Sequence, residues 1–510
     1  ESLDPYTNYI PESEIEDYRY MTTGQYGGIG ALIRQQGEYV VVSEPYEGFP
    51  AQKADLRAGD RIIRINDVDT KGKKTEDISK YLKGQASTTL KLLIEREGEK
   101  KPLEKVISRE EIKIKSVPYS GMLTKEVGYI KLTGFTENAA GEVKAALLDL
   151  KKNPELKSVI LDLRGNPGGL LKEAVDIVNI FVEKGTDVVS TRGKVKDWDK
   201  IHKALNAPVD LTIPVAVIVD RGSASASEIV SGSLQDLDRG VVIGQRSYGK
   251  GLVQQTRPLS YNAQLKVTVA KYYTPSGRCI QALDYSHRNE DGSVAKVPDS
   301  LITAFKTKNG RIVYDGGGVA PDLSMDAQKY SSILASLVTK NLIFDYATKY
   351  RSAHPAIAPA KEFKLTEAEY DEFLTYLNGK DYDYTTKTEK TIDDLKADAK
   401  DDKNFDAISA DIEALRSKII HNKKEDLVKY GPEIRQFLEE EIASRYYFQN
   451  GRLEASFKDD KELKESISLL NDENRYKKIL TTVVKADKPF NSEKEKQKNL
   501  RNFKSGGQEN

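Results

Sequence analysis

Between residues 106 and 325, short runs of aliphatic and β-branched residues alternate with longer amphipathic stretches, which predicts strands and helices in turn. The runs predicted to form strands are residues 128–133, 158–163, 213–219, 240–244, 252–259 and 264–273. Apolar residues at helical spacing predict helices over residues 139–151, 170–182 and 225–237. The pattern is typical of an α/β core in which helices pack against a sheet.

Residues 25–105 form a smaller, more strand-rich region. A glycine-rich turn at Gly27-Gly28 precedes an apolar strand, and residues 75–82 predict one helix with Ile78 and Leu82 four apart on one face. The plain alternative for the turn is a hairpin. It is not a nucleotide-binding motif, because no βαβ unit follows it.

Beyond about residue 330 the chain becomes a series of amphipathic helices with many Lys and Glu pairs. The predicted helices are residues 333–350, 366–377, 392–403, 407–420 and 432–447, and residues 493–510 are polar enough to be loose. Such helices could cap an active site, mediate dimers or dock another protein, although charged helices more often form solvated faces. The predicted parts of the chain are residues 1–24, which belong with the core, then 25–105, 106–325 and 326–510.

Composition narrows the classes of function. The 510 residues carry a formal net charge of zero, so nothing favours a nucleic-acid partner. No run of about 18 apolar residues predicts a membrane-spanning helix. The single cysteine, Cys279, excludes an internal disulfide and is expected to be a small buried hydrophobe. No Cys/His cluster predicts a metal site, and no cofactor is expected. Because the chain lacks an initial methionine and a signal peptide, we expect a processed or truncated form of a longer protein.

The most informative stretch joins the strand at residues 213–219 to the helix at 225–237. It reads Asp220-Arg-Gly-Ser-Ala-Ser-Ala-Ser and places hydroxyl groups where the first N–H groups of a helix have no partner inside the helix. A serine hydroxyl needs an adjacent base to act as a nucleophile. Sequence alone does not choose among Ser223, Ser225 and Ser227, and a helix N-cap is the plain alternative.

Lysine is the base that this sequence offers. None of the four histidines lies in a catalytic pattern, whereas Lys250 is flanked by glycines and followed by apolar residues. A lysine can act as a base if burial lowers its pKa from ~10.4 toward ~7–8. Gln254 lies four residues on, a spacing that puts both side chains on one face of a strand or a helix, and its amide oxygen could hold the amine.

A second turn follows the predicted strand at residues 158–163. Its sequence, Arg164-Gly-Asn-Pro-Gly-Gly169, offers backbone N–H groups at the start of a helix, as an oxyanion hole requires. Taken alone it could be an ordinary turn between a strand and a helix. Together with the serine stretch and Lys250, this turn favours the interpretation that the three elements form a catalytic site.

These motifs resemble the carboxyl-terminal processing protease family, Ser/Lys endopeptidases with an embedded PDZ domain. The similar segments, in family order, are residues 2–7, 27–30, 56–63, 162–170, 222–228, 247–251, 272–277 and 315–322. The resemblance implies a multidomain α/β and α+β fold: a PDZ domain at 25–105, a tail-specific protease core at 106–325 and a mainly helical extension at 326–510. It implies Ser225 as nucleophile, Lys250 as general base and Gln254 as its support. The implied oxyanion donors are the N–H groups of Ala226 and of Gly168 or Gly169.

The resemblance also implies how a substrate would be recognised. A PDZ domain binds a peptide C-terminus by strand addition, with backbone amides around the carboxylate. The implied contacts are Gly27, Gly28, Ile29, Gly30, Ile78 and Leu82. The expected partners are proteins or peptides with a free, apolar C-terminus, and the expected location is the periplasm or cell envelope of a bacterium. A homo-oligomer or an adaptor complex through the helical region is a further expectation. The alternative function is a non-catalytic peptide-binding scaffold in which Ser225 only caps a helix.

Overall fold

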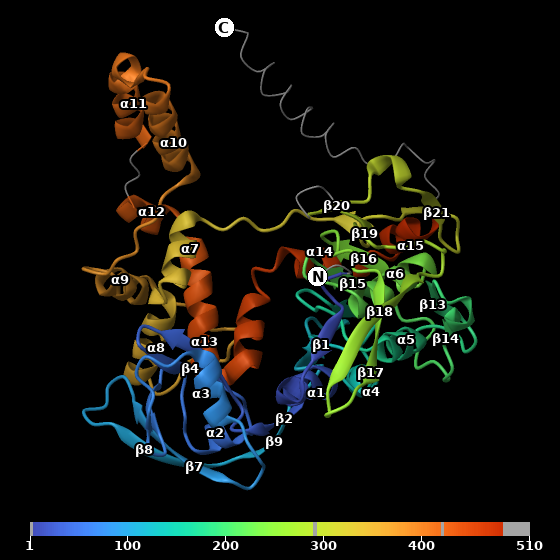
Figure 1. Cartoon of the computed structure of the whole chain (residues 1–510), viewed down its shortest axis with the longest axis horizontal. Helices are drawn as coiled ribbons and strands as arrows, with labels where there is room; N and C mark the ends of the chain where they lie inside the picture. The colour runs from blue at the N-terminus through green and yellow to red at the C-terminus, as the bar shows by residue number, and fades with distance from the viewer. Residues whose placement is uncertain (1–3, 289–292, 420–422, 483–510) are drawn as a thin grey trace. The chain divides into compact units, whose positions relative to one another are not determined.

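The structure is a computed structural model that describes residues 4–288, 293–419 and 423–482 (Figure 1). The chain divides into two compact units. The first, here called the core unit, comprises residues 1–26, 113–327 and 461–510. The second, the PDZ–helical unit, comprises residues 27–112 and 328–460. The chain passes between the units four times: within two short strands, β2 (Gln25–Gly28) and β9 (Glu110–Lys113), and again after residues 327 and 460.

A six-stranded sheet forms the centre of the core unit. Its strands, in spatial order, are β10 (Tyr119–Met122), β11 (Val127–Lys131), β12 (Ser158–Asp162), β15 (Val215–Val219), β16 (Val241–Gly244) and β23 (Leu323–Ser324). Only β10 runs antiparallel to its neighbour; the other pairs are parallel. Every residue of β12 and β15 is buried, which explains why both strands are continuous apolar runs in the sequence.

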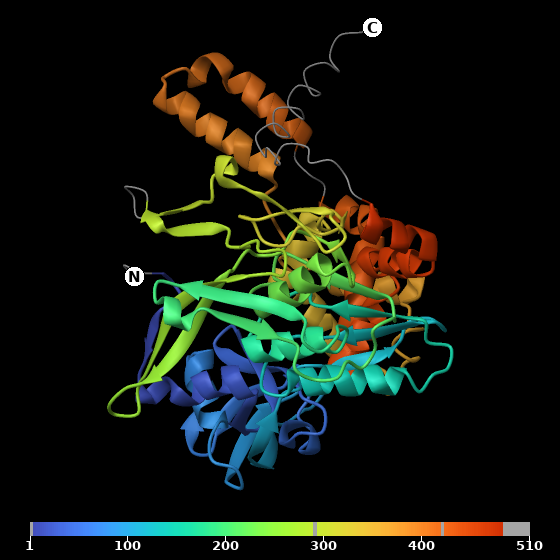
Figure 2. The same ribbon diagram turned by 90° about the vertical axis from the view of Figure 1, so that its right-hand side faces the viewer.

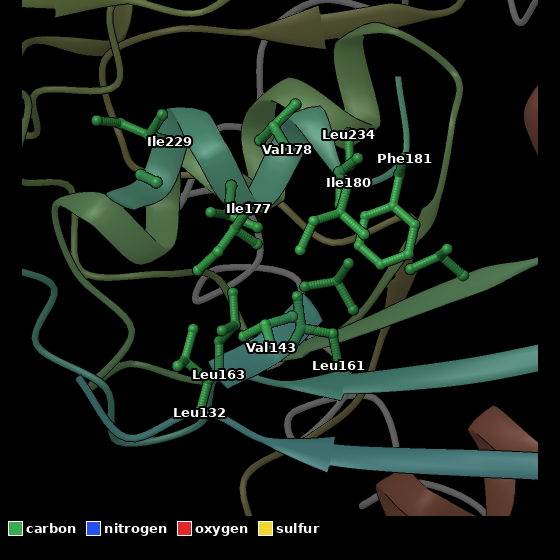
Figure 3. Close-up of a cluster of buried hydrophobic side chains, with 14 of the residues drawn as sticks. Leu132, Val143, Leu161, Leu163, Ile177, Val178, Ile180, Phe181, Ile229 and Leu234 are labelled. Carbon is green, nitrogen blue, oxygen red and sulfur yellow. The ribbon is translucent and has the colours of Figure 1, made fainter. Parts of the chain in front are cut away.

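Three helices cover this sheet: α4 (Ala139–Leu150), α5 (Leu171–Asn179) and α6 (Ala226–Asp236). Figure 3 shows the cluster between them, in which Leu161 and Leu163 lie below Ile177 and Ile229. Two further helices, α14 (Lys461–Leu470) and α15 (Glu473–Thr481), come from far along the chain and pack against β15 and β16. The large buried apolar surface on parallel strands is the main source of stability in this unit.

A second, antiparallel sheet borders the first. Its strands are β1 (Asn8–Ile10), β18 (Gln264–Tyr273), β13 (Asp187–Gly193) and β14 (Lys200–Lys203) in that order, with β17 (Leu252–Pro258) also paired to β18. The long hairpin of β17 and β18 is the yellow-green ribbon of Figure 2. Its register shifts between Val253 and Gln254, so a bulge lies at the point where the strand begins. Short helix α1 (Ile15–Thr23) follows β1.

The first half of the PDZ–helical unit is a small sheet with two helices. The sheet order is β3 (Ala31–Gln36), β4 (Tyr39–Pro45), β5 (Arg61–Ile65), β7 (Thr89–Glu95) and β8 (Leu103–Ser108), and β6 (Val68–Asp69) also pairs with β5. The helices are α2 (Pro50–Lys53) and α3 (Thr75–Leu82), and α3 has the bounds that the sequence predicts. β3 is the first strand in the order of this sheet.

The second half of this unit is helical. Its helices are α7 (Ser332–Thr339), α8 (Leu342–Ala353), α9 (Glu367–Tyr376), α10 (Lys387–Asp401), α11 (Phe405–Ile419), α12 (Lys423–Lys429) and α13 (Gly431–Ser456). The predicted single helix at residues 333–350 is two helices, because Asn341 takes a left-handed conformation with φ 61° between them. The predicted loose segment at 493–510 lies outside the described residues.

Charged contacts connect the small sheet to the helices within this unit. The Arg34 guanidinium of β3 lies 3.6 Å from the centre of the Phe344 ring, and the Gln36 amide donates to Asp345 of the same helix. Arg452 of α13 pairs with Glu44 of β4 at 2.9 Å. These contacts hold the outer face of β3 and β4 against α8 and α13.

Residues 461–482 fall in the core unit, whereas the sequence pattern groups them with the preceding helices. In the described parts of the chain, no helix has the length and apolar character to cross a membrane.

Candidate active site

Two loops meet where neighbouring parallel strands of the central sheet end. The serine stretch follows β15 and the Gly-Gly turn follows β12, and these strands pair in parallel register. Carboxyl ends of adjacent parallel strands lie at one edge of a sheet, which is where open α/β folds place their sites. The serine stretch and the Gly-Gly turn therefore lie close together because β12 and β15 are neighbours in the sheet.

The three serines of this stretch have different environments. Ser223 and Ser227 have no exposed surface, and their hydroxyls donate to the backbone carbonyls of Leu163 (2.8 Å) and Asn166 (2.9 Å). Ser225 is only partly buried and lines a cavity. Two of the three hydroxyls thus have structural roles, and Ser225 is the one placed to meet a substrate.

Ser225 precedes α6 with φ 56° and ψ −112°, a conformation that L-residues rarely adopt. Ala226 is the first residue of α6, where a backbone N–H has no partner within the helix. The Ala226 N–H lies next to Ser225 at the start of the helix. This arrangement places a hydroxyl group beside a donor that can stabilise negative charge.

The Gly-Gly turn lies directly against Ser225. A Cβ atom added to Gly168 would come within 2.8 Å of both Ser225 Cβ and Ala226 N. The Gly168 N–H donates to Asn166 Oδ1 at 2.9 Å, whereas within the described chain the Gly169 N–H has no such partner. The turn therefore leaves Gly169 as the freer donor of the two glycines.

Lys250 lines the same cavity and is partly buried. Burial lowers the pKa of its ammonium, and the nearby charge of Lys266 lowers it further, while Glu228 and Asp4 act in the opposite direction. The Lys250 Nζ lies 4.3 Å from the centre of the Tyr6 ring. Among the described residues no hydrogen bond joins this Nζ to the Ser225 hydroxyl, so the two groups share a cavity without a direct bond.

Gln254 also faces the cavity, but not through the regular strand geometry that its spacing suggests. Lys250 precedes β17, and the bulge between Val253 and Gln254 interrupts the alternation. The Gln254 amide donates to Thr268 Oγ1 at 3.1 Å. No hydrogen bond between Gln254 and Lys250 occurs in the described part of the chain.

Glu228 and Tyr272 connect the segments that carry Ser225 and Lys250, and the sequence interpretation missed both. The fully buried Glu228 carboxylate accepts the backbone N–H groups of Ser225 (2.8 Å) and Lys250 (2.9 Å), and also bonds to Ser247 and Gly249. On the carbonyl side, the Tyr272 hydroxyl contacts Ser225 O (3.0 Å) and Lys250 O (2.6 Å). Burial raises the pKa of Glu228 to about 7. The Ser-x-x-Glu spacing was a signal for Glu228; nothing local could indicate Tyr272.

The cavity itself has a volume of about 830 Å³. It contains Ser225, Ala226, Gly168, Gly169, Lys250 and Gln254, and its apolar lining includes Phe135, Leu170, Ile229, Leu252 and Val253. The structure therefore brings together all six residues of the predicted catalytic set. In the described residues, no group of three or more His, Cys, Asp or Glu side chains is arranged to hold a metal ion.

Comparisons with known proteins match the three parts of the chain separately. The profile of "Peptidase family S41" matches residues 126–287, that of the "PDZ domain" matches 41–96, and that of "Probable PDZ-protease, C-terminal helical domain" matches 333–470. A "Carboxy-terminal-processing protease" of Bartonella bacilliformis is 40% identical over 286 residues. The chain is similar to the carboxyl-terminal processing proteases.

The match to individual family members is partial. The Bartonella match covers 55% of this chain and 65% of the relative. A "Probable CtpA-like serine protease" of Staphylococcus aureus is 34% identical over 336 residues, which covers 65% of this chain and 59% of the relative. The chain thus matches less than two thirds of the length of these curated relatives. Among solved structures, the "Photosystem II D1 C-terminal processing protease" is 28% identical, with a TM-score of 0.36, covering 63% of this chain and 78% of that one.

The predicted PDZ contacts are largely enclosed. Gly28, Ile29 and Gly30 are buried, and Gly27 is partly buried against the backbone of Gly84. Ile78 and Leu82 of α3 are 0% and 5% exposed, and both belong to the core of the small sheet. Their role as peptide contacts stays a prediction.

Proposed function

We propose that this protein is a serine endopeptidase that cleaves proteins near their C-terminus, with Ser225 as nucleophile and Lys250 as general base. The observation that carries the proposal is the cavity, in which Ser225 lies with Lys250 while the hydroxyls of Ser223 and Ser227 bond to backbone carbonyls. Similarity to peptidase family S41 and to a carboxy-terminal-processing protease supports the same reaction.

Acylation would begin with transfer of the Ser225 Oγ proton to the neutral Lys250 amine. As the proton leaves, Oγ attacks the scissile carbonyl, and the carbonyl oxygen takes up negative charge. The N–H groups of Ala226 and Gly169 are placed to stabilise that charge, with Gly168 forming the wall beside them. The Lys250 ammonium then returns its proton to the leaving amine, and an acyl-enzyme remains.

Deacylation uses the same groups with water in place of the serine. Lys250 takes a proton from the attacking water and gives it to Ser225 Oγ as the tetrahedral intermediate collapses, which releases the new C-terminus and leaves the lysine neutral again. Gln254 supports this cycle by accepting a Lys250 N–H through its amide oxygen. The lysine must be neutral at the start, and its burial favours the neutral form.

The PDZ domain would supply substrate recognition. β3 is the first strand in the order of its sheet, and an extended peptide could add to it while the loop at Gly27–Gly30 receives the carboxylate. We propose proteins with an apolar C-terminus as substrates and a bacterial cell envelope or periplasm as location. The curated relatives named above are bacterial.

The test is cleavage of an unfolded protein with an apolar C-terminal tail, followed by mass spectrometry. Wild type, Ser225→Ala and the matched control Ser227→Ala are compared under the same conditions. We expect cleavage by wild type and by Ser227→Ala and none by Ser225→Ala. Equal cleavage by Ser225→Ala would refute the nucleophile assignment. Tail binding without cleavage in all three would support a peptide-binding scaffold instead.

A further inference from the structure

Gln254 is the middle of a chain of polar groups that reaches the N-terminal segment. Its Nε2 donates to Thr268 Oγ1 at 3.1 Å, and Thr268 Oγ1 donates to Asp4 Oδ1 at 3.1 Å. Asp4 is only 7% exposed, and Thr268 is partly buried in β18. The three side chains come from separate segments of the core unit.

The chemistry of these groups fixes the direction of the chain. A carboxylate can only accept hydrogen bonds, so the single Thr268 hydroxyl proton is committed to Asp4. The Thr268 oxygen can then only accept, and the group that it accepts from is the NH₂ of Gln254. With its NH₂ turned toward Thr268, the amide has its Oε1 available on the other side. An amide in this orientation can accept an N–H from the lysine, whereas the flipped amide would present a donor to an ammonium.

Local contacts hold Asp4 in place. Its carboxylate accepts the Tyr6 N–H at 2.9 Å and the Thr7 hydroxyl at 3.0 Å, and Thr7 Oγ1 in turn accepts the Thr268 N–H at 3.3 Å. The same turn presents the Tyr6 ring to the Lys250 ammonium. The turn at residues 4–7 therefore contacts the lysine on one side and the partner of the glutamine on the other.

We propose that Asp4 and Thr268 are positioning residues that act through Gln254 to set the orientation of its amide toward Lys250. The inference rests on the proposed roles of Lys250 and Gln254. It adds that the N-terminal segment supplies part of the machinery that aims the base. Lys250 is also influenced by Lys266 of β18 and Glu228 of α6, and the test leaves both of these groups unchanged.

Thr268→Val is the discriminating change, because it removes the hydroxyl with no change of charge and keeps a β-branched side chain suited to a strand. Thr268→Ser is the matched control that retains the hydroxyl. Both are made in the wild-type and in the Gln254→Ala background, and thermal unfolding confirms that each variant is folded.

Two readouts are compared. The first is kcat and KM for cleavage; the second is the pH midpoint of Lys250 labelling by trace acetic anhydride, read by mass spectrometry in a Ser225→Ala background. For Thr268→Val we expect kcat to fall about fivefold at unchanged KM, and the labelling midpoint to fall by about 0.5 pH units, because the ammonium loses an oriented acceptor. Thr268→Ser should match wild type, and in the Gln254→Ala background Thr268→Val should change neither readout.

Labelling separates this inference from the proposed function because it needs no peptidase activity. A midpoint that responds to Thr268→Val only when Gln254 is present supports the positioning role even if the protein cleaves nothing. A midpoint that is the same in Thr268→Val and wild type, or that shifts equally without Gln254, overturns it.

Discussion

Ser225 has a strained backbone. A conformation of this kind costs about 1–3 kcal/mol and persists only where contacts with the surrounding structure hold it. The surroundings here are one carboxylate and one hydroxyl. Glu228 accepts the N–H groups of Ser225 and Lys250, and Tyr272 bonds to their carbonyls. The backbones of the proposed nucleophile and base are thus fixed relative to each other by two buried side chains.

Glu228→Gln tests this arrangement. Four donors converge on the Glu228 carboxylate, and an amide offers one acceptor oxygen and directs its NH₂ toward groups that also donate. Losing two hydrogen bonds to a charged acceptor should reduce kcat about a hundredfold. Cleavage kinetics together with a melting curve measure the effect. Tyr272→Phe is a milder change, because it removes only the hydroxyl that bonds to the carbonyls of Ser225 and Lys250. A Glu228→Gln protein that cleaves at the wild-type rate would show that the hydrogen bonds between Glu228 and the Ser225 and Lys250 backbones have no catalytic importance.

The pH dependence of activity follows from two groups. Lys250 must lose a proton to act as base, and its pKa is lowered by burial and by Lys266, so activity should rise with pH at lower values than an ordinary lysine allows. Glu228, with a pKa of about 7, also loses its proton on this side and then accepts from all four donors. Protonation of either group therefore reduces activity as the pH falls.

Lys266→Met separates the two contributions. Removing the neighbouring positive charge should raise the pKa of Lys250 and move the acid limb of the kcat profile to higher pH, without moving the Glu228 transition. Rates measured from pH 5 to pH 10 in wild type and variant are the check. An unchanged profile would mean that Lys266 does not influence the base, and a flat wild-type profile would exclude lysine as the base.

At the scale of elements, the Gly-Gly turn shows why a particular glycine is needed. Gly168 has φ +99°, and an added Cβ would lie 2.6 Å from Ala224 O and 2.8 Å from Ala226 N, both backbone atoms that cannot move aside. Gly165, in the same turn, has φ +67° with open space around its Cβ position. The two glycines share a positive φ and differ in what surrounds them.

Gly168→Ala and Gly165→Ala therefore form a matched pair. In both variants an alanine must adopt a positive φ, which lowers the free energy of unfolding by about 1 kcal/mol. Only Gly168→Ala must also displace the backbone beside Ser225. We expect Gly165→Ala to keep most of its activity and Gly168→Ala to lose nearly all of it while remaining folded. Equal activity in the two variants would contradict close packing of the turn on Ser225.

The elements of the core were predictable because buried parallel strands leave an unmistakable pattern in sequence. β12 begins at the predicted residue, Ser158, and β15 lies within the predicted run of 213–219. Local backbone events were not predictable. The bulge at Gln254 depends on pairing with β18, and the break at Asn341 depends on one residue taking φ 61° within an otherwise helical pattern. Periodicity carries no information about either.

The candidate site was predictable to the level of motifs and no further. The sequence left Ser223, Ser225 and Ser227 open, since the choice depends on carbonyls of another loop more than 55 residues away along the chain. Tyr272 is 47 residues from Ser225 and enters the site only through the fold of β18. Long-range partners of this kind are set by strand order, which a single sequence does not state.

At the scale of the whole molecule, the core unit is assembled from three separate segments of chain. The path leaves it after residue 327 and returns at residue 461, after the helices of the other unit. On its return, Glu462 pairs with Arg164 at 2.7 Å, next to the Gly-Gly turn. The Tyr476 hydroxyl bonds to both the N–H and the carbonyl of Val215, at 3.0 Å each, where β15 begins. The last described helices are therefore part of the framework that positions the site.

Tyr476→Phe measures how strongly the catalytic sheet depends on this returning segment. Tyr476 is 7% exposed, and phenylalanine would remove the hydroxyl that bonds to the N–H and the carbonyl of Val215. The expected loss is about 1–3 kcal/mol in the free energy of unfolding, seen as a lower melting temperature. Glu465→Gln is the control, because it breaks the partly exposed pair with Arg475 between α14 and α15 and should cost less than about 1 kcal/mol. If residues 113–327 alone stabilise the core unit, both variants will have the melting temperature of wild type. A lower melting temperature in Tyr476→Phe only would show that a segment distant in sequence stabilises β15, the strand that leads to Ser225.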